Sequence, residues 1–369
     1  MLKSPQNSHS DLEAQALTQL RALLQAVPFI SLGNAIHEPA PIAKGWRPDL
    51  ALELQAGNDT WQLIVEFKSD GQPRHVRSAA LQLKDYLRNH STDAHAYPVV
   101  VAPFISQTSA EICKDAGVGF ADLAGNCHIA FDRVFIEKSV AENPFRKRRE
   151  QKSIFSTKNA RMLRLLLADP NKLWRVAQLA EQAQVSLGQV SNLRRRLLDE
   201  EWAALEKDGL KIAKPRELLE AWRQAYRREN EASESFYTLL HGEALDNAVR
   251  AALEDAGHGE HAVLASYSAG GWLAPFSRVA SLYLYADAQG EAILRKHLKL
   301  EPPGRGANVS LVRPKDDGVF LDRIEAAGGI WCTSPIQTYL DLAVSGERAA
   351  EAAEHLFNEK IAPRWKAGL

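Results

Sequence analysis

The stretch Trp61-Gln62-Leu63-Ile64-Val65-Glu66-Phe67-Lys68 has the composition of a β-strand that ends in two charged residues. Turn-forming triplets, Gly57-Asn58-Asp59 and Ser69-Asp70-Gly71, bound it on both sides. Because side chains alternate along a strand, Glu66 and Lys68 share one face with Ile64. An ionised group is costly to bury unless it is paired or bound to a metal. The end of this strand is therefore a candidate site.

The preceding segment supplies a second carboxylate. Asp49-Leu50-Ala51-Leu52-Glu53-Leu54 alternates as a strand, and a hairpin through residues 57–59 would place Asp49 near Glu66. Two carboxylates, with the Phe67 carbonyl beside them, offer the oxygen ligands that Mg²⁺ prefers. Lys68 would then orient water or stabilise developing charge. The alternative is a plain salt bridge between Lys68 and either acid.

Helices are expected on both sides of this hairpin, at residues 11–27 and 75–89. Glu13 falls on the apolar stripe of the first, where it is either a first-turn acid favoured by the helix dipole or a site residue. Gln82 and Tyr86 lie one turn apart on the second. The apolar run at residues 98–102 is suited to a central strand covered on both faces. Further β-like segments at 119–122 and 128–137 complete an α/β domain.

The motifs Pro48-Asp49, Glu66-Phe67-Lys68 and Gln82-Leu83-Lys84-Asp85-Tyr86 resemble, in order and spacing, those of the PD-(D/E)xK nuclease superfamily. The resemblance implies a restriction-endonuclease-like fold in which Asp49 and Glu66 bind Mg²⁺ and Lys68 serves catalysis. Gln82 and Tyr86 would support the site or contact the DNA backbone. Glu13 occupies the place of the first-helix acid of that superfamily.

A basic interval begins after Pro144 and includes Arg146, Lys147, Arg148 and Arg149, with Lys158, Arg161 and Arg164 further along. Such a run is either a solvated linker or a source of salt-sensitive affinity for phosphates. Here it leads into a helix capped by Ser156. That position in the chain favours a contribution to DNA binding.

The apolar positions Leu179-Ala180, Val185, Val190, Leu193 and Leu197 have the spacing of a helix-turn-helix, and Asp208-Gly209 supplies the turn of a wing. Amide, hydroxyl and guanidinium groups on a recognition helix read base edges and phosphates. The candidate DNA-binding residues of this winged helix are Ser186, Gln189, Ser191, Asn192, Arg195 and Arg196. Winged helices also serve as protein-protein modules, which is the alternative.

The last third of the chain mixes β-like runs at 281–286, 309–312 and 319–321 with helices at 334–343 and 348–357, typical of an α+β domain. Leu219-Glu220-Ala221-Trp222, Gly306-Ala307-Asn308-Val309 and Ser334-Pro335-Ile336-Gln337-Thr338-Tyr339-Leu340-Asp341-Leu342 resemble the AbiEi family of type IV toxin-antitoxin systems. Gly119-Phe120-Ala121-Asp122-Leu123-Ala124-Gly125-Asn126 is similar to a stretch of its longer, nuclease-like relatives. The resemblance implies an antitoxin that represses its own operon and has a cognate toxin. The chain differs from the short members of the family by its large N-terminal domain.

The bulk composition agrees with three domains, at residues 1–143, 144–214 and 215–369 of a chain of 369 residues with a formal net charge of -1. Three cysteines without a CxxC pair favour a reducing cytoplasm, and no apolar run has membrane-spanning length. We expect DNA as a partner and a homodimer as one option. The first hypothesis is a transcriptional regulator or antitoxin. The competing ones are a Mg²⁺-dependent endonuclease targeted by its winged helix, and an interaction protein that needs no DNA.

Overall fold

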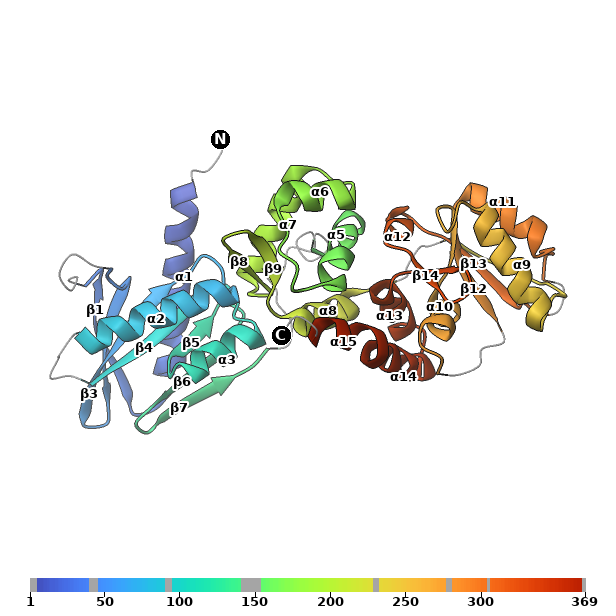
Figure 1. The fold of residues 1–369 in the computed structure, drawn as a ribbon. Coiled ribbons are helices and arrows are strands. Elements are labelled where there is room, and N and C mark those ends of the chain that lie inside the picture. Colours follow the sequence, from blue (N-terminus) through green and yellow to red (C-terminus); the bar gives the residue numbers. More distant parts are fainter. Residues whose placement is uncertain are drawn as a thin grey trace. The chain divides into compact units, whose positions relative to one another are not determined.

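The computed structural model describes residues 5–39, 46–89, 95–140, 154–227, 232–276, 281–303 and 306–366 (Figure 1). The chain forms two compact units. The first comprises Met1–Arg149 with Asp199–Glu201, and the second comprises Glu150–Leu198 with Trp202–Leu369. Within the described ranges, no helix is both long and apolar enough to cross a membrane.

The first unit is built on a seven-stranded sheet whose spatial order follows the chain. Strands β3, β4 and β5 are parallel to one another, whereas every other neighbouring pair is antiparallel. The parallel strands therefore end at the same edge of the sheet. The strands are β1 (Ile30–His37), β2 (Leu50–Ala56), β3 (Asp59–Phe67), β4 (His95–Ala102), β5 (Gly119–Asp122), β6 (Cys127–Phe131) and β7 (Val134–Lys138).

Helices cover both faces of this sheet (Figure 1). Helix α1 (Pro5–Gln25) packs Leu20 and Leu24 against a core that includes Val65. Helices α2 (Pro73–Asn89) and α3 (Gln107–Asp115) close the other face, where Leu83 shares a core with Ile64. Strand β4 is fourth of seven and is buried from Tyr97 to Ala102, so the predicted central strand is confirmed.

The predicted hairpin between β2 and β3 is confirmed, with Leu50 paired to Val65 and Ala56 to Asp59. The single strand expected at residues 128–137 was wrong, because Asp132 adopts a φ of 46° and turns the chain between β6 and β7. Strand β1 was not predicted. A register shift between Leu32 and Ala35 interrupts the alternation by which it could have been found.

The second unit begins with three helices and a hairpin, at the positions that the sequence predicted. Leu166, Leu179, Val190 and Leu210 belong to one core, to which Ala203 of the hairpin also contributes, so all three helices and both strands share it. Ser156 is the backbone N-cap of the first helix, although its side chain accepts no capping hydrogen bond. We call these elements the helix-hairpin segment: α5 (Thr157–Ala168), α6 (Val176–Ala183), α7 (Leu187–Asp199), β8 (Ala203–Glu206) and β9 (Gly209–Ile212).

Helix α8 (Pro215–Ala225) leads to a six-stranded mixed sheet of order β10-β13-β12-β11-β15-β14. Helices α9 and α11 pack on one face, and α10, α13 and α14 lie on the other (Figure 1). The bounds are β10 (Ala232–Phe236), α9 (Gly242–Asp255), β11 (Ala262–Leu264), α10 (Ser266–Leu273), β12 (Leu282–Ala286), α11 (Ala288–His297), β13 (Val309–Arg313), β14 (Ile324–Ala326), β15 (Ile330–Cys332), α13 (Pro335–Ala343), α14 (Glu347–Leu356), η1 (Phe357–Ile361) and α15 (Ala362–Lys366).

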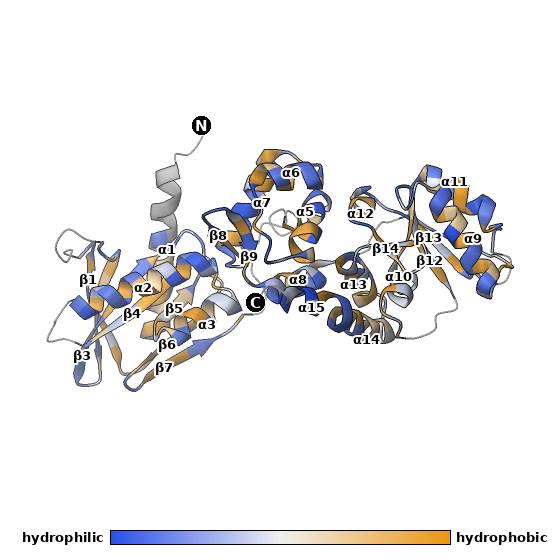
Figure 2. Ribbon diagram, viewed as in Figure 1, coloured by the Kyte–Doolittle hydropathy of each residue, from blue (hydrophilic) through white to orange (hydrophobic). Residues whose placement is uncertain are grey.

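Hydrophobic and hydrophilic residues alternate along α9 and α11, as expected of helices with one buried face (Figure 2). The strand expected at residues 319–321 was wrong. This segment is the short helix α12 (Gly318–Leu321), because the Asp316 carboxylate accepts the Gly318 N–H at 2.9 Å and the Phe320 N–H bonds to the Asp317 carbonyl. These two hydrogen bonds close a helical turn, which is incompatible with an extended strand at these residues.

Candidate functional site

The charged end of β3 lies at the edge where β3, β4 and β5 finish. Glu66 is only 4 % exposed and faces the α2 side of the sheet, together with Ile64. The Lys68 ammonium bonds to Glu66 Oε1 at 2.6 Å. Asp49 stands one position before β2, opposite Glu66, and its Oδ2 accepts the Phe67 N–H at 2.7 Å. The structure thus brings together the three residues that the sequence predicted.

Burial raises the pKa of Glu66 from its ordinary value of 4.5 to about 7. The hydrogen bond and charge of Lys68 oppose this rise, while the charge of the neighbouring Asp49 carboxylate adds to it. Two carboxyl groups are therefore held close together in a largely dry place. Such a pair shares a proton readily or binds a cation.

The residues present fit a divalent cation. Glu66 Oε2 is buried and makes no hydrogen bond in the described structure, so its lone pairs are open on the side of Glu66 not held by Lys68. Among the described residues, no group of three or more His, Cys, Asp or Glu side chains could hold a metal. Two carboxylates with water suffice for Mg²⁺, which keeps several of its waters in proteins. Asp49 and Glu66 are the residues that would hold it.

Gln82 and Tyr86 lie on α2, which packs over β3 and β4. The Tyr86 ring is buried and meets Trp46 edge-on, with ring centroids 6.1 Å apart. Desolvation raises the pKa of its hydroxyl group, so it stays neutral. Gln82 Oε1 is buried without a hydrogen bond in the described structure. Helix α2 thus places both residues on the Glu66 side of the sheet.

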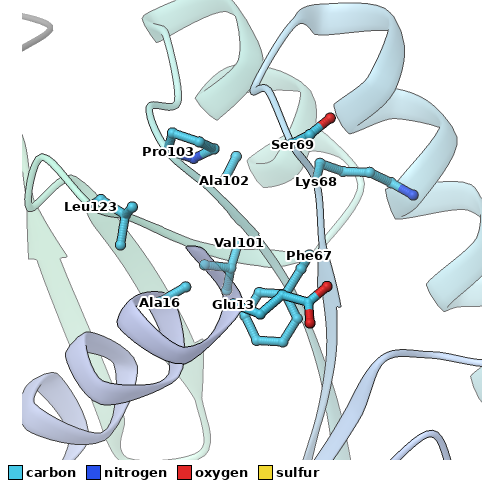
Figure 3. A pocket seen from close by; sticks show the side chains of 9 residues that line it. All are labelled: Glu13, Ala16, Phe67, Lys68, Ser69, Val101, Ala102, Pro103 and Leu123. Carbon is cyan, nitrogen blue, oxygen red and sulfur yellow. The ribbon is translucent and has the colours of Figure 1, made fainter. Parts of the chain in front are cut away.

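Glu13 lies on the opposite side of β3, in a pocket beside the middle of α1 (Figure 3). Its carboxylate is beside the Phe67 ring, and Phe67 belongs to the α1-side core. Lys68 and Ser69 also line this pocket, but the Lys68 side chain extends away from Glu13. The structure therefore groups Glu13 with the Phe67 face of the strand and not with Glu66.

A second buried acid at the same sheet edge escaped the sequence reasoning. Asp122, 2 % exposed, accepts the Ile105 N–H at 2.8 Å and both the backbone and side-chain N–H groups of Asn126. Asn126 in turn accepts the Val140 N–H at 2.5 Å. These bonds fix the loops after β4 and β5. The Asp122-x-x-Gly125-Asn126 pattern was the available signal in the sequence, and the structure gives Gly125 a φ of 100° at this turn.

Helix α7 presents a polar face. Ser186 and Gln189 form a capping box, in which the Gln189 N–H donates to Ser186 Oγ at 3.3 Å and the Ser186 N–H donates to Gln189 Oε1 at 3.1 Å. Ser191, Asn192 and Arg195 are exposed, whereas Arg196 is half-buried. The candidate residues Arg146, Lys147, Arg148 and Arg149 lie outside the described residues.

Two arginines of the predicted basic interval are directed inward. Arg161 forms a two-bond ion pair with Asp316, at 2.6 and 2.8 Å. Arg164 is 3 % exposed and bonds to Asp322 at 2.8 Å, to the Gln337 side chain at 3.1 Å and to the Gly318 carbonyl at 2.7 Å. Their charges are neutralised within the second unit, so they add nothing to a phosphate-binding surface.

The stretch Ser334–Leu342 continues this network. Gln337 and Asp341 lie one turn apart on α13, and the Gln337 amide donates to Asp341 Oδ1 at 3.0 Å. The same oxygen accepts the hydroxyl groups of Tyr226 at 2.7 Å and Tyr285 at 3.1 Å. We call these contacts, with those of Arg164, the polar hub. The hub connects α5, α8, β12 and α13.

Apart from Arg164, the residues of the hub lie within a segment that matches a family model. Residues 211–362 match the family model described as "Transcriptional regulator, AbiEi antitoxin, Type IV TA system". This AbiEi region runs from β9 to α15 and contains the predicted Ser334–Leu342 motif, and it spans less than half of the chain. No curated protein matches the chain.

Two solved structures are similar to 31 % of the chain. One is a repair endonuclease from Pyrococcus abyssi, at 18 % identity, 46 % coverage of that chain and a TM-score of 0.24. The other is an EndoMS-dsDNA2 complex, at 20 % identity, 44 % coverage of that chain and a TM-score of 0.23. The chain thus spans less than half the length of either structure, and at these scores neither similarity determines a fold or an activity.

The raised pKa of Glu66 predicts a stability that depends on pH. The folded chain holds the Glu66 proton more tightly than the unfolded chain, so this group favours folding below pH 4.5 and the benefit is lost as the pH rises through about 7. We expect Glu66→Gln to raise the free energy of unfolding at pH 8 by about 1–2 kcal/mol, since part of the gain is offset by the lost Lys68 pair.

Thermal unfolding at pH 5 and pH 8, with and without Mg²⁺, measures this effect. Mg²⁺ should raise the Tm of the wild type at pH 8 and leave that of Glu66→Gln unchanged. Glu53→Gln, an exposed glutamate on β2, is the control and should behave as wild type. An equal Mg²⁺ response in Glu66→Gln would show that Glu66 does not hold the ion.

Proposed function

We propose that this chain is a DNA-binding transcriptional regulator of the antitoxin type, with a nuclease-like first unit. The observation that carries the proposal is the exposed polar face of α7, which belongs to the same unit as the AbiEi region. The polar hub joins α5 to that region through buried charge-assisted bonds. Helix α7, which would bind DNA, and the AbiEi region would then belong to one rigidly packed unit.

In this proposal the helix-hairpin segment is a winged helix. Helix α7 enters the major groove, where Asn192 and Arg195 have the amide and guanidinium groups that recognise adenine and guanine edges. The β8–β9 hairpin, with exposed Lys207 at its turn, lies along the phosphate backbone as a wing. The DNA is the promoter of the chain's own operon, and a cognate toxin is the expected protein partner.

A gel-shift titration on the DNA upstream of its own gene tests the proposal. Asn192→Ala and Arg195→Ala should each weaken specific binding roughly 5- to 150-fold, because a bidentate base contact contributes about 1–3 kcal/mol. Lys296→Ala, an exposed cation on α11, should bind as wild type. If the wild type shows no preference for upstream DNA over a scrambled fragment, the proposal is wrong.

A second candidate function, a Mg²⁺-dependent endonuclease, is favoured by the open Glu66 Oε2 atom beside Asp49 and Lys68. Mg²⁺ held by Asp49 and Glu66 would supply polarisation of a phosphate group. Lys68, which is held by its hydrogen bond to Glu66, would place its ammonium near the reacting phosphate. The buried Gln82 carbonyl oxygen would accept a hydrogen bond from a water molecule or a DNA group that enters the site.

The two functions are separated by incubating plasmid with Mg²⁺ and either wild-type or Lys68→Ala protein, next to the gel shift. Cleavage that is lost in Lys68→Ala supports the endonuclease. A specific shift without cleavage leaves the regulator and excludes the enzyme under these conditions. If the protein neither cleaves the plasmid nor shifts the upstream DNA, an interaction protein that needs no DNA is favoured.

A further inference from the structure

Helix α7 begins with two residues that folding alone does not explain. Leu187, its first residue, is 58 % exposed, among the large apolar side chains that the structure leaves open to solvent. Gly188 follows it and is also exposed. An exposed leucine gains little from burial, and a glycine within a helix destabilises that helix relative to alanine. Both choices are unfavourable for the chain alone.

The glycine is not required by the surrounding structure. A Cβ atom at Gly188 would meet only Ser186 Oγ, at 4.0 Å, and Gly188 does not adopt a positive φ. Space for a side chain is therefore available on the protein side. What a side chain at this position would obstruct is a partner that approaches the backbone of α7 from outside.

The neighbouring side chains identify the chemistry of that partner. Gly188 lies at the centre of the exposed face, one helical turn from Asn192 and two turns from Arg195, and Leu187 lies at its edge beside Ser191. Gln189 Oε1 is occupied by the capping box with Ser186. The groups that remain on the exposed face are the Asn192 amide, the Ser191 hydroxyl and the Arg195 guanidinium, with Leu187 as the one large apolar group. The major groove carries the matching pattern: donors and acceptors interrupted by the thymine methyl group.

We propose that Leu187 is a specificity-determining residue that packs against the C5-methyl group of a thymine, and that Gly188 allows the start of α7 to approach the base edges closely. This inference rests on the proposed DNA-binding function and deepens it. It predicts a target half-site that contains a thymine within reach of the start of α7, next to the bases read by Asn192 and Arg195.

Single thymine-to-uracil replacements in the footprinted upstream DNA test the inference, because uracil lacks only the methyl group. With the full-length wild type, uracil at one or two positions should weaken binding about fourfold, the amount expected for one buried methyl group. Leu187→Ala should bind thymine and uracil probes equally. Leu239→Ala, an exposed leucine outside the helix-hairpin segment, should retain the fourfold discrimination.

Gly188→Ala provides an independent measurement. It should raise the Tm of the protein, since alanine favours the helix, and at the same time weaken DNA binding at least several-fold. Specific binding by the wild type with no uracil-sensitive position would overturn the role of Leu187 and leave the proposed regulator intact. Absence of any specific binding would overturn both. Discrimination that persists in Leu187→Ala would assign the methyl contact to another residue.

Discussion

Replacement of Arg164 by alanine is expected to lower the free energy of unfolding of the second unit by about 3–5 kcal/mol. The guanidinium is 3 % exposed and makes contacts with Asp322, Gln337 and the Gly318 carbonyl. Its removal leaves the largely buried Asp322 carboxylate and two buried acceptors without their donor, and a charge left without its partner there costs more than the ion pair contributed. Urea denaturation followed by tryptophan fluorescence measures the change.

Lys158→Ala is the matched control, because this lysine is exposed on the same helix and its loss should change stability by less than about 0.5 kcal/mol. Asp322→Ala and the double variant complete a cycle. The double variant should be less destabilised than the sum of the two single losses, since one removal already breaks the pair. A loss below about 1 kcal/mol for Arg164→Ala would contradict the assignment of Arg164 to a buried network.

The second large effect is expected at Gly71, in the loop between β3 and α2. A Cβ atom there would lie 1.9 Å from the Phe104 carbonyl oxygen, and the Gly71 carbonyl accepts the Ser109 hydroxyl at 2.7 Å. The clashing atom belongs to the backbone and cannot rotate away as a side chain could, so Gly71→Ala should destabilise the first unit by about 3 kcal/mol or more. Thermal unfolding measures this loss, and the displaced loop should also weaken the Mg²⁺-dependent rise in Tm.

Gly271→Ala supplies the contrast. This glycine is exposed on α10 and a Cβ atom would meet nothing within 4 Å, so alanine should stabilise the protein by up to about 1 kcal/mol. If both substitutions had the same sign, close backbone approach would not be the reason for glycine at position 71.

The sequence predicted those parts of the fold that short-range patterns determine. Alternation and a turn-forming triplet located the β2–β3 hairpin, because its partner strands are adjacent in the chain. Residues 319–321 look like a strand by composition, yet Asp316 and Asp317 bend them into α12. Arg161 and Arg164 were read as part of a basic interval because their acidic partners lie more than 150 residues away. No local pattern marks such a pairing.

The candidate site shows the same limit. The hairpin register was sufficient to bring Asp49, Glu66 and Lys68 together, since it follows from two neighbouring strands. The side of the sheet covered by α1 was not available from the sequence, and the structure places Glu13 on the Phe67 side. The capping role of Gln189 could have been predicted, because Ser186-x-x-Gln189 is a capping box motif.

The polar hub also bears on how such a gene could be assembled from parts. All of its members, from Arg164 to Asp341, lie after residue 150, and they join α5 to helices and strands that follow residue 214. A recombination junction near codon 214 would separate the buried Arg164 from its partner Asp322 and leave each residue in a different product. A junction near codon 150 would leave the hub whole. We therefore expect the helix-hairpin segment and the AbiEi region to be inherited as one cassette, to which the first unit was added or from which it was lost.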